Sequence, residues 1–519
     1  MILGDFNLVL DPLMDSDQYK HVNNPKSRNT LIQIMNVFNL VNSFRVTHPT
    51  GRRFTWRRKN PARQARLDYF LVSHALHDII TDCCINPSYR SNHSSIQMKL
   101  LINKFERGRG LWKFNCSLLK DKSYVEMINL IIQEEKQKYA IPVYSLDFLS
   151  KAPNDSIQLT LKDGQFLEIL LMRIRGETIK FASFKKKMDL NIENQLKSEI
   201  KKFEENKDTA EHVLLEGKKC ELEKLRESLI QGHVVRSRAQ WLSEGEKPSK
   251  FFCSLEKHNY IEKTIKCIQL DNGTKLTDQK EILNEIRNFY SSLFSQQTPL
   301  SVAHLESILG KYNIRKLTQA ESDTLEGDLN LQEISFALKN MKNNKCPGVD
   351  GFPAEFFKFF WGHLKYFVVR ALNSSYYSGL MSTSMRTCII NCLPKGDKSR
   401  EFMKNWRPIS LLSVMYKLAS SAIANRLKTV LEVLICKAQT GFLKGRFIGD
   451  STRLVYDIMH HLEHNNLSGQ LMLVDFQKAF DSVSWAFLMA ILKYLNFGDS
   501  FRKWISVFNN NIKAHVLQS

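Results

Sequence analysis

The chain has 519 residues, 43% of them apolar, so it is long and apolar enough for several domains with cores of their own. Lys and Arg outnumber Asp and Glu by 74 to 53. The net charge of +21 suits a polyanionic partner, although a basic protein without a nucleic-acid role fits it equally well. The ten cysteines form no C-x-x-C pair, which argues against a zinc site and is typical of reduced thiols in a cytoplasmic or nuclear protein. We find no signal-peptide pattern and no apolar run near the ~20 residues of a membrane helix, so we expect neither secretion nor membrane insertion.

Composition divides the chain into three expected segments. Residues 1–102 mix short apolar runs with Pro, Asn, Ser and Gly, which is typical of a loop-rich α/β unit. We interpret residues 103–320 as a basic helical linker and residues 321–519 as a mixed α/β enzyme segment. The first and last residues both lie in strand-like sequence, which indicates a piece of a longer chain. We therefore expect an α+β multidomain protein.

Polar side chains adjoin three apolar runs in the first segment. Asp5 and Asn7 follow the run MIL, Asp68 begins LDYFLV, and His93 precedes SIQMKL. Hard cations such as Mg²⁺ prefer oxygen ligands, and phosphodiester cleavage needs a polarised phosphate and an activated water. Asp, Asn and His at neighbouring strand ends can supply these groups, so we expect the four side chains to converge. Taken singly, each is more often a turn or a cap.

The order G-D-F-N, R-L-D-Y, S-x-H-S resembles the C-terminal half of the endonuclease/exonuclease/phosphatase superfamily, as found at the front of LINE-type polyproteins. The resemblance implies part of a two-sheet sandwich and a Mg²⁺-dependent nuclease. In it, Asp5 and Asn7 contact the attacking water and the scissile phosphate. Asp68 is a nearby acid, and His93 stabilises the pentacovalent phosphate. Asn92 replaces the acid of the family's S-D-H, so we expect His93 to lack a carboxylate partner and the chain not to cut DNA.

The middle segment contains apolar side chains at helical spacing, which predicts long amphipathic helices that form a hairpin. These side chains are Ile192, Leu196, Ile200, Phe203, Leu215, Leu222, Leu225 and Leu229. A solvated helical spacer without a function of its own is the alternative. Residues 234–260 interleave basic and aromatic side chains and resemble the connector between the two LINE domains. They could hold template RNA by phosphate contacts and stacking, or equally form a packed helix.

The last segment predicts a series of elements in chain order. A helix over LQEISFALKNM leads into the turn Lys345–Gly351, and a buried strand ends at Pro394 and Lys395. Arg407 precedes a long helix with one apolar stripe, and Arg446 closes the run Q-T-G-F-L-K-G-R. The run LMLV (471–474) reads as a buried strand, and a last helix, capped by Ser482 or Ser484, ends at Gly498.

Asp475 stands at the end of the run LMLV. A carboxylate on a rigid strand end, next to a backbone carbonyl, suits a Mg²⁺–triphosphate complex. Phosphoryl transfer consists mostly of positioning and charge neutralisation, so Lys395, Arg407 and Arg446 could bind triphosphate or template phosphates. For any one of these residues alone, a cap or a surface charge is the simpler interpretation.

Five ordered motifs from Lys345 to about Phe497 resemble the fingers and early palm of LINE-type reverse transcriptases: P-G-V-D-G, L-P-K, N-W-R-P-I-S-L, Q-x-G-F-x-x-G-R and D-F-x-K-A-F-D. The resemblance implies that Asp475 and the Phe476 carbonyl bind metal. Phe480 is then the gate against a ribose 2′-hydroxyl, and the basic residues above lie near the nucleotide. The later Y/F-A-D-D motif of the family is not in this sequence.

We therefore expect an RNA-directed DNA polymerase of a non-LTR retrotransposon with an attached endonuclease, truncated and inactive. Its partners would be an RNA template, a DNA target and deoxynucleoside triphosphates, with Mg²⁺ as the cofactor, in a cytoplasmic and nuclear ribonucleoprotein. A non-catalytic RNA- or DNA-binding remnant is one alternative, and a group II intron-like maturase is another. The nuclease-like block argues against the maturase.

Overall fold

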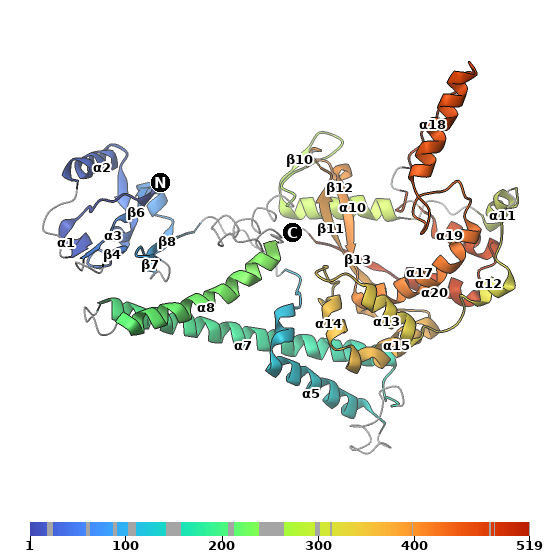
Figure 1. Cartoon of the computed structure of the whole chain (residues 1–519), viewed down its shortest axis with the longest axis horizontal. Helices are drawn as coiled ribbons and strands as arrows, with labels where there is room; N and C mark the ends of the chain where they lie inside the picture. Colours follow the sequence, from blue (N-terminus) through green and yellow to red (C-terminus); the bar gives the residue numbers. More distant parts are fainter. Residues whose placement is uncertain are drawn as a thin grey trace. The chain divides into compact units, whose positions relative to one another are not determined.

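The computed structural model describes residues 1–17, 24–58, 63–86, 91–101, 110–141, 157–205, 212–237, 264–295, 301–311, 314–396, 398–476, 479–481 and 483–517. The chain divides into two compact units. Unit 1 contains Met1–Arg109 and Ala182–Asn259, and unit 2 contains Gly110–Phe181 and Tyr260–Ser519. Each unit combines helices with small sheets, which confirms the α+β class (Figure 1). The division differs from the three expected segments, because parts of the expected linker belong to unit 2.

Two three-stranded antiparallel sheets and one hairpin form the N-terminal part of unit 1. The first sheet has the order β1-β6-β3, the second β2-β5-β4, and β7 pairs with β8. The strands are β1 (Ile2–Asp5), β2 (Ser16–Asp17), β3 (Leu40–Asn42), β4 (Trp56–Arg58), β5 (Arg63–Ala65), β6 (Asp68–Ser73), β7 (Ile80–Asn86) and β8 (Ser95–Leu100). The helices between them are α1 (Pro12–Asp15), α2 (Pro25–Val37), α3 (Ser43–Thr47) and α4 (His74–His77).

Strand β6 is the centre of this part, because its alternating side chains enter separate cores. Tyr69 and Leu71 pack with Leu8 and with Leu31 of α2. Phe70, on the opposite side of the strand, packs with the core around Phe44. The strand predictions for MIL, LDYFLV and SIQMKL are confirmed as β1, β6 and β8.

The predicted helical hairpin is confirmed by α7 (Asp163–Glu205) and α8 (His212–Ser237). Leu196 and Ile200 of α7 share a core with Leu222 of α8. Arg226 of α8 lies 3.2 Å from Glu193 of α7, so charged pairs flank the apolar seam. The first half of α7 belongs to unit 2, together with the 3₁₀ helix η1 (Cys116–Lys120) and α5 (Lys122–Tyr139).

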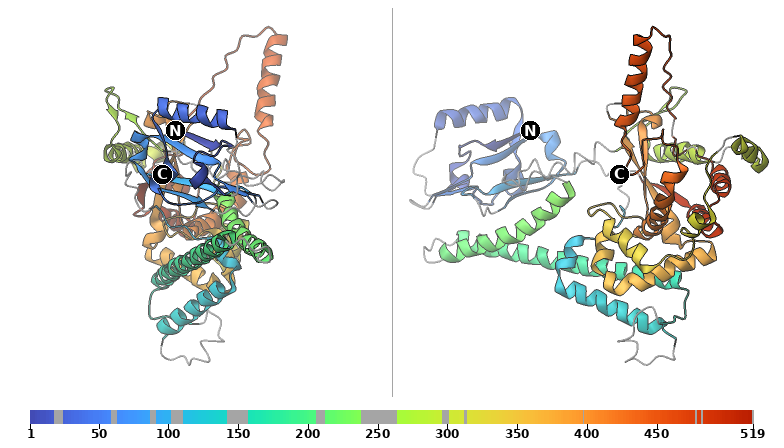
Figure 2. Two further views of the ribbon diagram at one scale, coloured as in Figure 1. Left: turned by 90° about the vertical axis from the view of Figure 1, so that its left-hand side faces the viewer. Right: turned by 45° about the vertical axis from the view of Figure 1, so that its right-hand side comes forward.

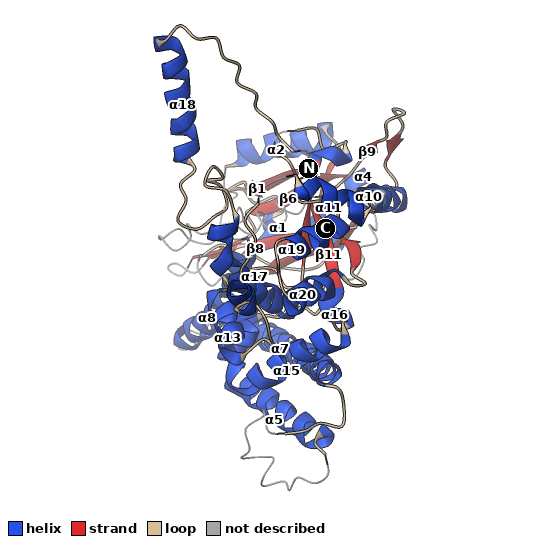
Figure 3. Ribbon diagram, turned by 90° about the vertical axis from the view of Figure 1, so that its right-hand side faces the viewer, coloured by secondary structure: helices blue, strands red, loops and turns tan. Residues whose placement is uncertain are grey.

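The remainder of unit 2 is mainly helical, as Figure 3 shows by colour. Its helices are α10 (Gln279–Phe294), α11 (Val302–Gly310), α12 (Gln319–Asp323), α13 (Leu331–Asn340), α14 (Ala354–Phe359), α15 (Trp361–Ser378), α16 (Thr383–Arg386), η4 (Met403–Asn405), α17 (Val414–Leu434), α18 (Gly449–His464), α19 (Trp485–Tyr494) and α20 (Asp499–Asn509). The predicted helix LQEISFALKNM is α13, where Asn330 and Glu333 form a capping box. None of the described helices combines the length and apolar character that a bilayer-spanning segment requires.

A three-stranded sheet of order β12-β11-β13 carries the L-P-K and N-W-R-P-I-S-L motifs. It contains β11 (Thr387–Pro394), β12 (Trp406–Leu411) and β13 (Lys513–Leu517). Its buried face packs on α10, where Ile286 and Tyr290 share a core with Ile390, Cys392 and Trp406. The short hairpin of β9 (Ile268–Gln269) and β10 (Lys275–Leu276) contributes to the same core. The expected linker therefore supplies part of the support of this sheet.

The prediction of a buried strand at residues 471–474 is wrong. These residues form no regular structure, and their side chains are exposed by 61–85%. Strand β11 already has β12 on one side and β13 on the other, so no place beside it remains for LMLV. A strand needs both a hydrogen-bonding neighbour and apolar cover, and the described residues provide neither for this run.

Two further predictions concern the start and the end of helix α19. Ser484 caps α19 as expected, since its hydroxyl accepts the backbone N–H of Phe487. Ser482, the other serine considered, lies outside the described residues. The prediction that Gly498 ends α19 is wrong, because Asn496 takes the left-handed conformation there, at φ 63°, and Gly498 caps α20 instead.

Candidate active sites

Three of the four nuclease-like side chains of unit 1, those of Asp5, Asp68 and His93, lie close together. Asp5 ends β1 and pairs directly with Asp68, the first residue of the antiparallel neighbour β6. His93 lies just before β8, and a backbone bridge joins it to Trp56 of β4. One ligand atom each from Asp5, Asp68 and His93 lies within 4.8 Å of the other two. Strand pairing therefore gathers acids that are 63 positions apart in the sequence.

The histidine has a carboxylate partner, which corrects the expectation drawn from Asn92. His93 Nδ1 lies 3.0 Å from Asp68 Oδ2, and His93 Nε2 lies 3.9 Å from Asp5 Oδ2. The backbone carbonyl of Asn92 accepts the N–H of Arg57 instead. The sequence comparison placed the missing acid next to the histidine along the chain, whereas the fold supplies one from β6.

Asn7 completes the group on the Asp5 side. Its backbone N–H donates to Asp5 Oδ1 at 2.9 Å, and its φ of 51° turns the chain immediately beyond β1. Asn tolerates this left-handed conformation better than most residues. The turn therefore orients the Asp5 carboxylate while keeping Asn7 beside it.

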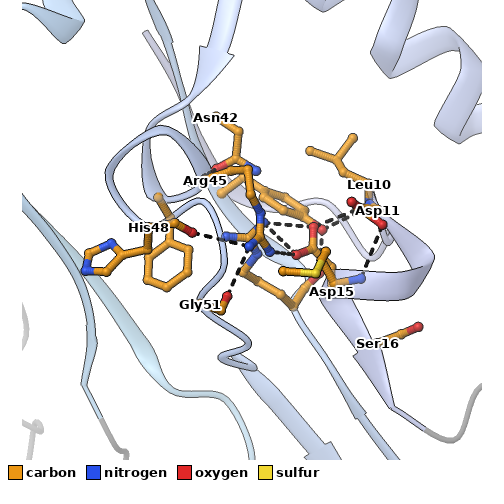
Figure 4. A network of polar contacts seen from close by, with 12 residues as sticks. Leu10, Asp11, Asp15, Ser16, Asn42, Arg45, His48 and Gly51 are labelled. Atoms are coloured by element: carbon orange, nitrogen blue, oxygen red, sulfur yellow. Dashed lines mark hydrogen bonds and ion pairs between the residues drawn. The ribbon is translucent and has the colours of Figure 1, made fainter.

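A buried ion-pair network supports the loop that follows Asn7. Asp15 and Arg66 are each only 1% exposed, and Arg66 Nη2 lies 2.8 Å from Asp15 Oδ2. Arg45 also donates to Asp15 and to the carbonyls of His48 and Gly51, as Figure 4 shows. Breaking one side of a buried pair leaves an uncompensated charge, so these contacts fix the loop strongly.

Tyr69 connects this network to β6. Its hydroxyl donates to the carbonyls of Leu8 and Arg66 and accepts the N–H of Leu10 at 3.1 Å. Burial and the nearby Asp15 charge raise the pKa of the Tyr69 hydroxyl, so it remains a neutral donor. The strand that ends in Asp68 and the loop after Asn7 are thereby held together.

The donor set of this cluster fits a hard divalent cation. Asp5 and Asp68 offer carboxylate oxygens, which Mg²⁺ prefers, and Asp5 Oδ2 lies 3.9 Å from His93 Nε2. The residues around Asp475 do not form such a site. Within the described residues, Asp5, Asp68 and His93 are the one cluster of three or more potential metal ligands. The expected strand beneath Asp475 is absent, and Phe476 is 76% exposed.

Lys395 and Arg407 lie at the same end of the β11–β12 hairpin. Arg407 pairs with Leu393, and the backbone N–H of Lys395, two residues further on, donates to the Asn405 carbonyl. Because side chains alternate along a strand, both basic groups lie on one side of the hairpin. Arg407 is exposed, and Lys395 Nζ donates to the Lys404 carbonyl at 2.7 Å. This face can accept an anion.

Arg446 has a different position from the one expected for a phosphate ligand. Its guanidinium donates to four carbonyls at the end of α17 and the following turn, those of Glu432, Ile435, Cys436 and Gln439. A phosphate would have to compete with these hydrogen bonds. Phe480, the expected sugar gate, is 88% exposed.

The sequence interpretation overlooked an acid in the P-G-V-D-G turn whose carboxyl group is largely enclosed. Asp350 Oδ1 is buried and accepts no hydrogen bond from the described residues. Burial raises the pKa of the Asp350 carboxyl to about 6, against the backbone N–H groups of Phe352 and Gly351, which lower it. Burial likewise lowers the pKa of Lys417, on the neighbouring helix α17. An acid between two glycines in an otherwise apolar turn was the available signal.

Comparison with known proteins identifies the C-terminal part. Residues 393–519 match the family "Reverse transcriptase (RNA-dependent DNA polymerase)". The chain is 29% identical over 510 residues to the transposon TX1 uncharacterized 149 kDa protein of Xenopus laevis, which covers 96% of the chain and 37% of that protein. These matches support the resemblance to LINE-type (non-LTR) retrotransposon polyproteins.

A second relative is similar over a shorter part of the chain. The chain is 26% identical over 198 residues to the retrovirus-related Pol polyprotein from type-1 retrotransposable element R1 of Bradysia coprophila. That match covers 37% of the chain and 19% of the relative. The chain thus spans little more than a third of the first relative and a fifth of the second.

Proposed function

We propose that the chain is part of a reverse transcriptase, an RNA-directed DNA polymerase, with an attached Mg²⁺-dependent endonuclease. The observation that carries the proposal is the reverse transcriptase match over residues 393–519, which include Lys395, Arg407 and Asp475. By this proposal unit 2 contains the fingers and early palm, and the N-terminal part of unit 1 is part of a two-sheet nuclease sandwich. The substrates are an RNA template, a DNA target and deoxynucleoside triphosphates.

In the polymerase part, Lys395 and Arg407 neutralise phosphate charge on one side of the β11–β12 hairpin. Asp475 and the Phe476 carbonyl, the metal ligands that the resemblance implies, lie in an exposed, irregular segment that does not form a metal site within the described residues. Phe480 would exclude the ribose 2′-hydroxyl. Arg446 acts by holding the end of α17 rather than by touching phosphate. Because the 519 residues contain no Y/F-A-D-D motif, we expect this chain to bind a primed template without extending it.

In the nuclease part, Asp68 holds the His93 ring through Nδ1, which leaves Nε2 to stabilise phosphate charge. Asp5 takes the proton of the attacking water, and Asn7 orients the water or the phosphate. A divalent ion held by Asp5 and Asp68 would polarise the phosphate when bound.

A binding experiment tests the polymerase part. The affinity for a primed RNA template should fall steeply as salt rises, and replacing Lys395 and Arg407 together by Ala should reduce the slope of log K against log salt by about 1.4–1.8. Replacing Lys339 and Lys428, two exposed lysines of the same unit, is the matched control and should have less effect. Equal slopes for the two double variants would contradict the assignment of Lys395 and Arg407.

Metal binding tests the nuclease part without relying on turnover. Mn²⁺, a paramagnetic substitute for Mg²⁺, should broaden the His93 ring resonances in the full chain, and Asp5→Asn should remove the broadening. Asp82→Asn, which removes an exposed carboxylate on β7, is the control. Absence of broadening at millimolar Mn²⁺ would refute the metal site.

Supercoiled-plasmid nicking tests the cleavage itself. Asp68 supplies the carboxylate that Asn92 does not, so nicking that disappears in both Asp68→Asn and His93→Ala would establish a nuclease. The second candidate function, nucleic-acid binding without catalysis, is favoured by the exposed, irregular segment that carries Asp475. Salt-sensitive binding without nicking would select it.

A further inference from the structure

The loop between α17 and α18 has a rigid base. Arg446 closes it by donating to the carbonyls of Ile435, Cys436 and Gln439, at 2.9, 2.5 and 2.7 Å. The hydroxyls of Thr440 and Ser451 lie 2.7 Å apart, which joins the middle of the loop to the first turn of α18. Between these anchors stand Gly441 to Gly445, the tip of the loop. The tip is thus short and held at both sides.

Phe442, in this tip, has a backbone conformation that is unfavourable for its side chain. Its φ is +65°, in the left-handed region. Every other non-glycine residue with positive φ in the described chain is Asn, which tolerates this region through its short polar side chain. Phe has no such compensation. A strained residue of this kind persists only where the surrounding structure or a function maintains it.

Packing does not account for the strain at Phe442. Its side chain is 98% exposed, the highest exposure found for a large apolar residue in the described chain. Phe447 and Ile448, which follow in the loop, are each 69% exposed, and Lys444 is exposed as well. An aromatic ring therefore projects fully into solvent from a fixed base, beside a cation and further apolar surface.

We propose that Phe442 is a stacking platform for an unpaired base of a single-stranded RNA. An exposed ring stacks on the π-face of any unpaired base, and a neighbouring lysine can pair with the adjacent phosphate. A duplex offers little to this ring, because its bases are already stacked on one another. The chain's net charge of +21 favours such a polyanionic partner over an apolar protein surface. The choice of RNA rests on the proposed reverse transcriptase function.

The test uses the full chain and a 12-nucleotide RNA with a central 2-aminopurine. Phe442→Asn should lower the affinity roughly five- to a hundredfold, the range for loss of one stacked base. It should also abolish the quenching of 2-aminopurine fluorescence on binding. The same variant relieves the left-handed strain, so the thermal midpoint should stay the same or rise. Phe442→Trp should keep both affinity and quenching, whereas Phe442→Leu should lose them, since stacking needs a ring.

The matched control is Phe336→Ala, which removes another exposed phenyl ring of unit 2, 58% exposed on α13. It should leave RNA affinity unchanged. An unchanged affinity in Phe442→Asn would overturn the proposal, as would full affinity in Phe442→Leu, which indicates apolar docking. A loss confined to single-stranded DNA or to duplex RNA would overturn it too. If the unaltered chain fails to bind any RNA, the proposed function itself fails, and this outcome is distinct from the others.

Discussion

Asp350 occupies a turn that is packed from two sides. Gly348 lies against the backbone of Leu412 and Ser413, and Gly351, at φ +81°, lies against the Trp112 ring. A side chain at either glycine would collide with these neighbours, so the turn that carries Asp350 is closely packed. Its Oδ1 atom lacks a hydrogen-bond partner among the described residues. A buried acid of this kind makes the stability of unit 2 depend on pH.

The sign and size of the effect follow from the pKa of Asp350. Burial raises it from the ordinary 3.8 to about 6 in the folded chain. The carboxyl therefore favours the fold fully while protonated, below about pH 4, and that contribution is lost as the pH rises through about 6. The difference corresponds to about 3 kcal/mol, at about 1.4 kcal/mol for each tenfold change in proton affinity. Asp350→Asn should thus stabilise unit 2 by up to about 3 kcal/mol at pH 7.5 and by little at pH 4.

Hydrogen exchange of the peptides that cover α14 and α15, measured in urea at several pH values, would report the local free energy of opening. The unaltered chain should lose stability between pH 4 and pH 6.5, and Asp350→Asn should flatten this dependence. Asp457→Asn, which removes an exposed carboxylate of α18, is the control and should change stability by less than about 0.5 kcal/mol. Equal opening energies for Asp350→Asn and the unaltered chain at pH 7.5 would refute the reasoning.

Tyr69→Phe should destabilise unit 1 by about 1–3 kcal/mol, because the backbone N–H of Leu10 loses its hydrogen-bond acceptor in a buried site. A urea titration measures this effect, and a stability within error of the unaltered chain would contradict it. Gly351→Ala should destabilise unit 2 and shift the Trp112 fluorescence, because the added Cβ would collide with the Trp112 ring. An unchanged spectrum together with unchanged stability would argue against this packing. Arg446→Met should cost about 1–3 kcal/mol and speed hydrogen exchange at the end of α17, by exposing the carbonyls that Arg446 now satisfies. If it instead lowers nucleotide binding without changing exchange, Arg446 is a phosphate ligand after all.

The exposed helix α18 shows where local sequence is sufficient. Its 16 residues form a helix although none is buried, as its projection in Figures 2 and 3 illustrates. The cap at Ser484 and the alternation in β8 were likewise predictable, because these signals act within a few residues of the chain. The ordered motifs of the reverse transcriptase segment belong to the same class of local information.

Pairings between distant segments were decided only by the tertiary structure. The sequence predicted that Asp68 and His93 lie close together, but not which carboxylate contacts the imidazole. That contact is set by the antiparallel register of β1 and β6 and by the bridge between Trp56 and His93. Conversely, LMLV has the composition of a buried strand and forms none, because composition cannot say whether a neighbouring strand has a free edge. Whether an apolar segment is buried depends on the elements that pack against it as well as on its own residues. For this reason the charge state of Asp350 and the exposure of Phe442 were also outside the reach of the sequence.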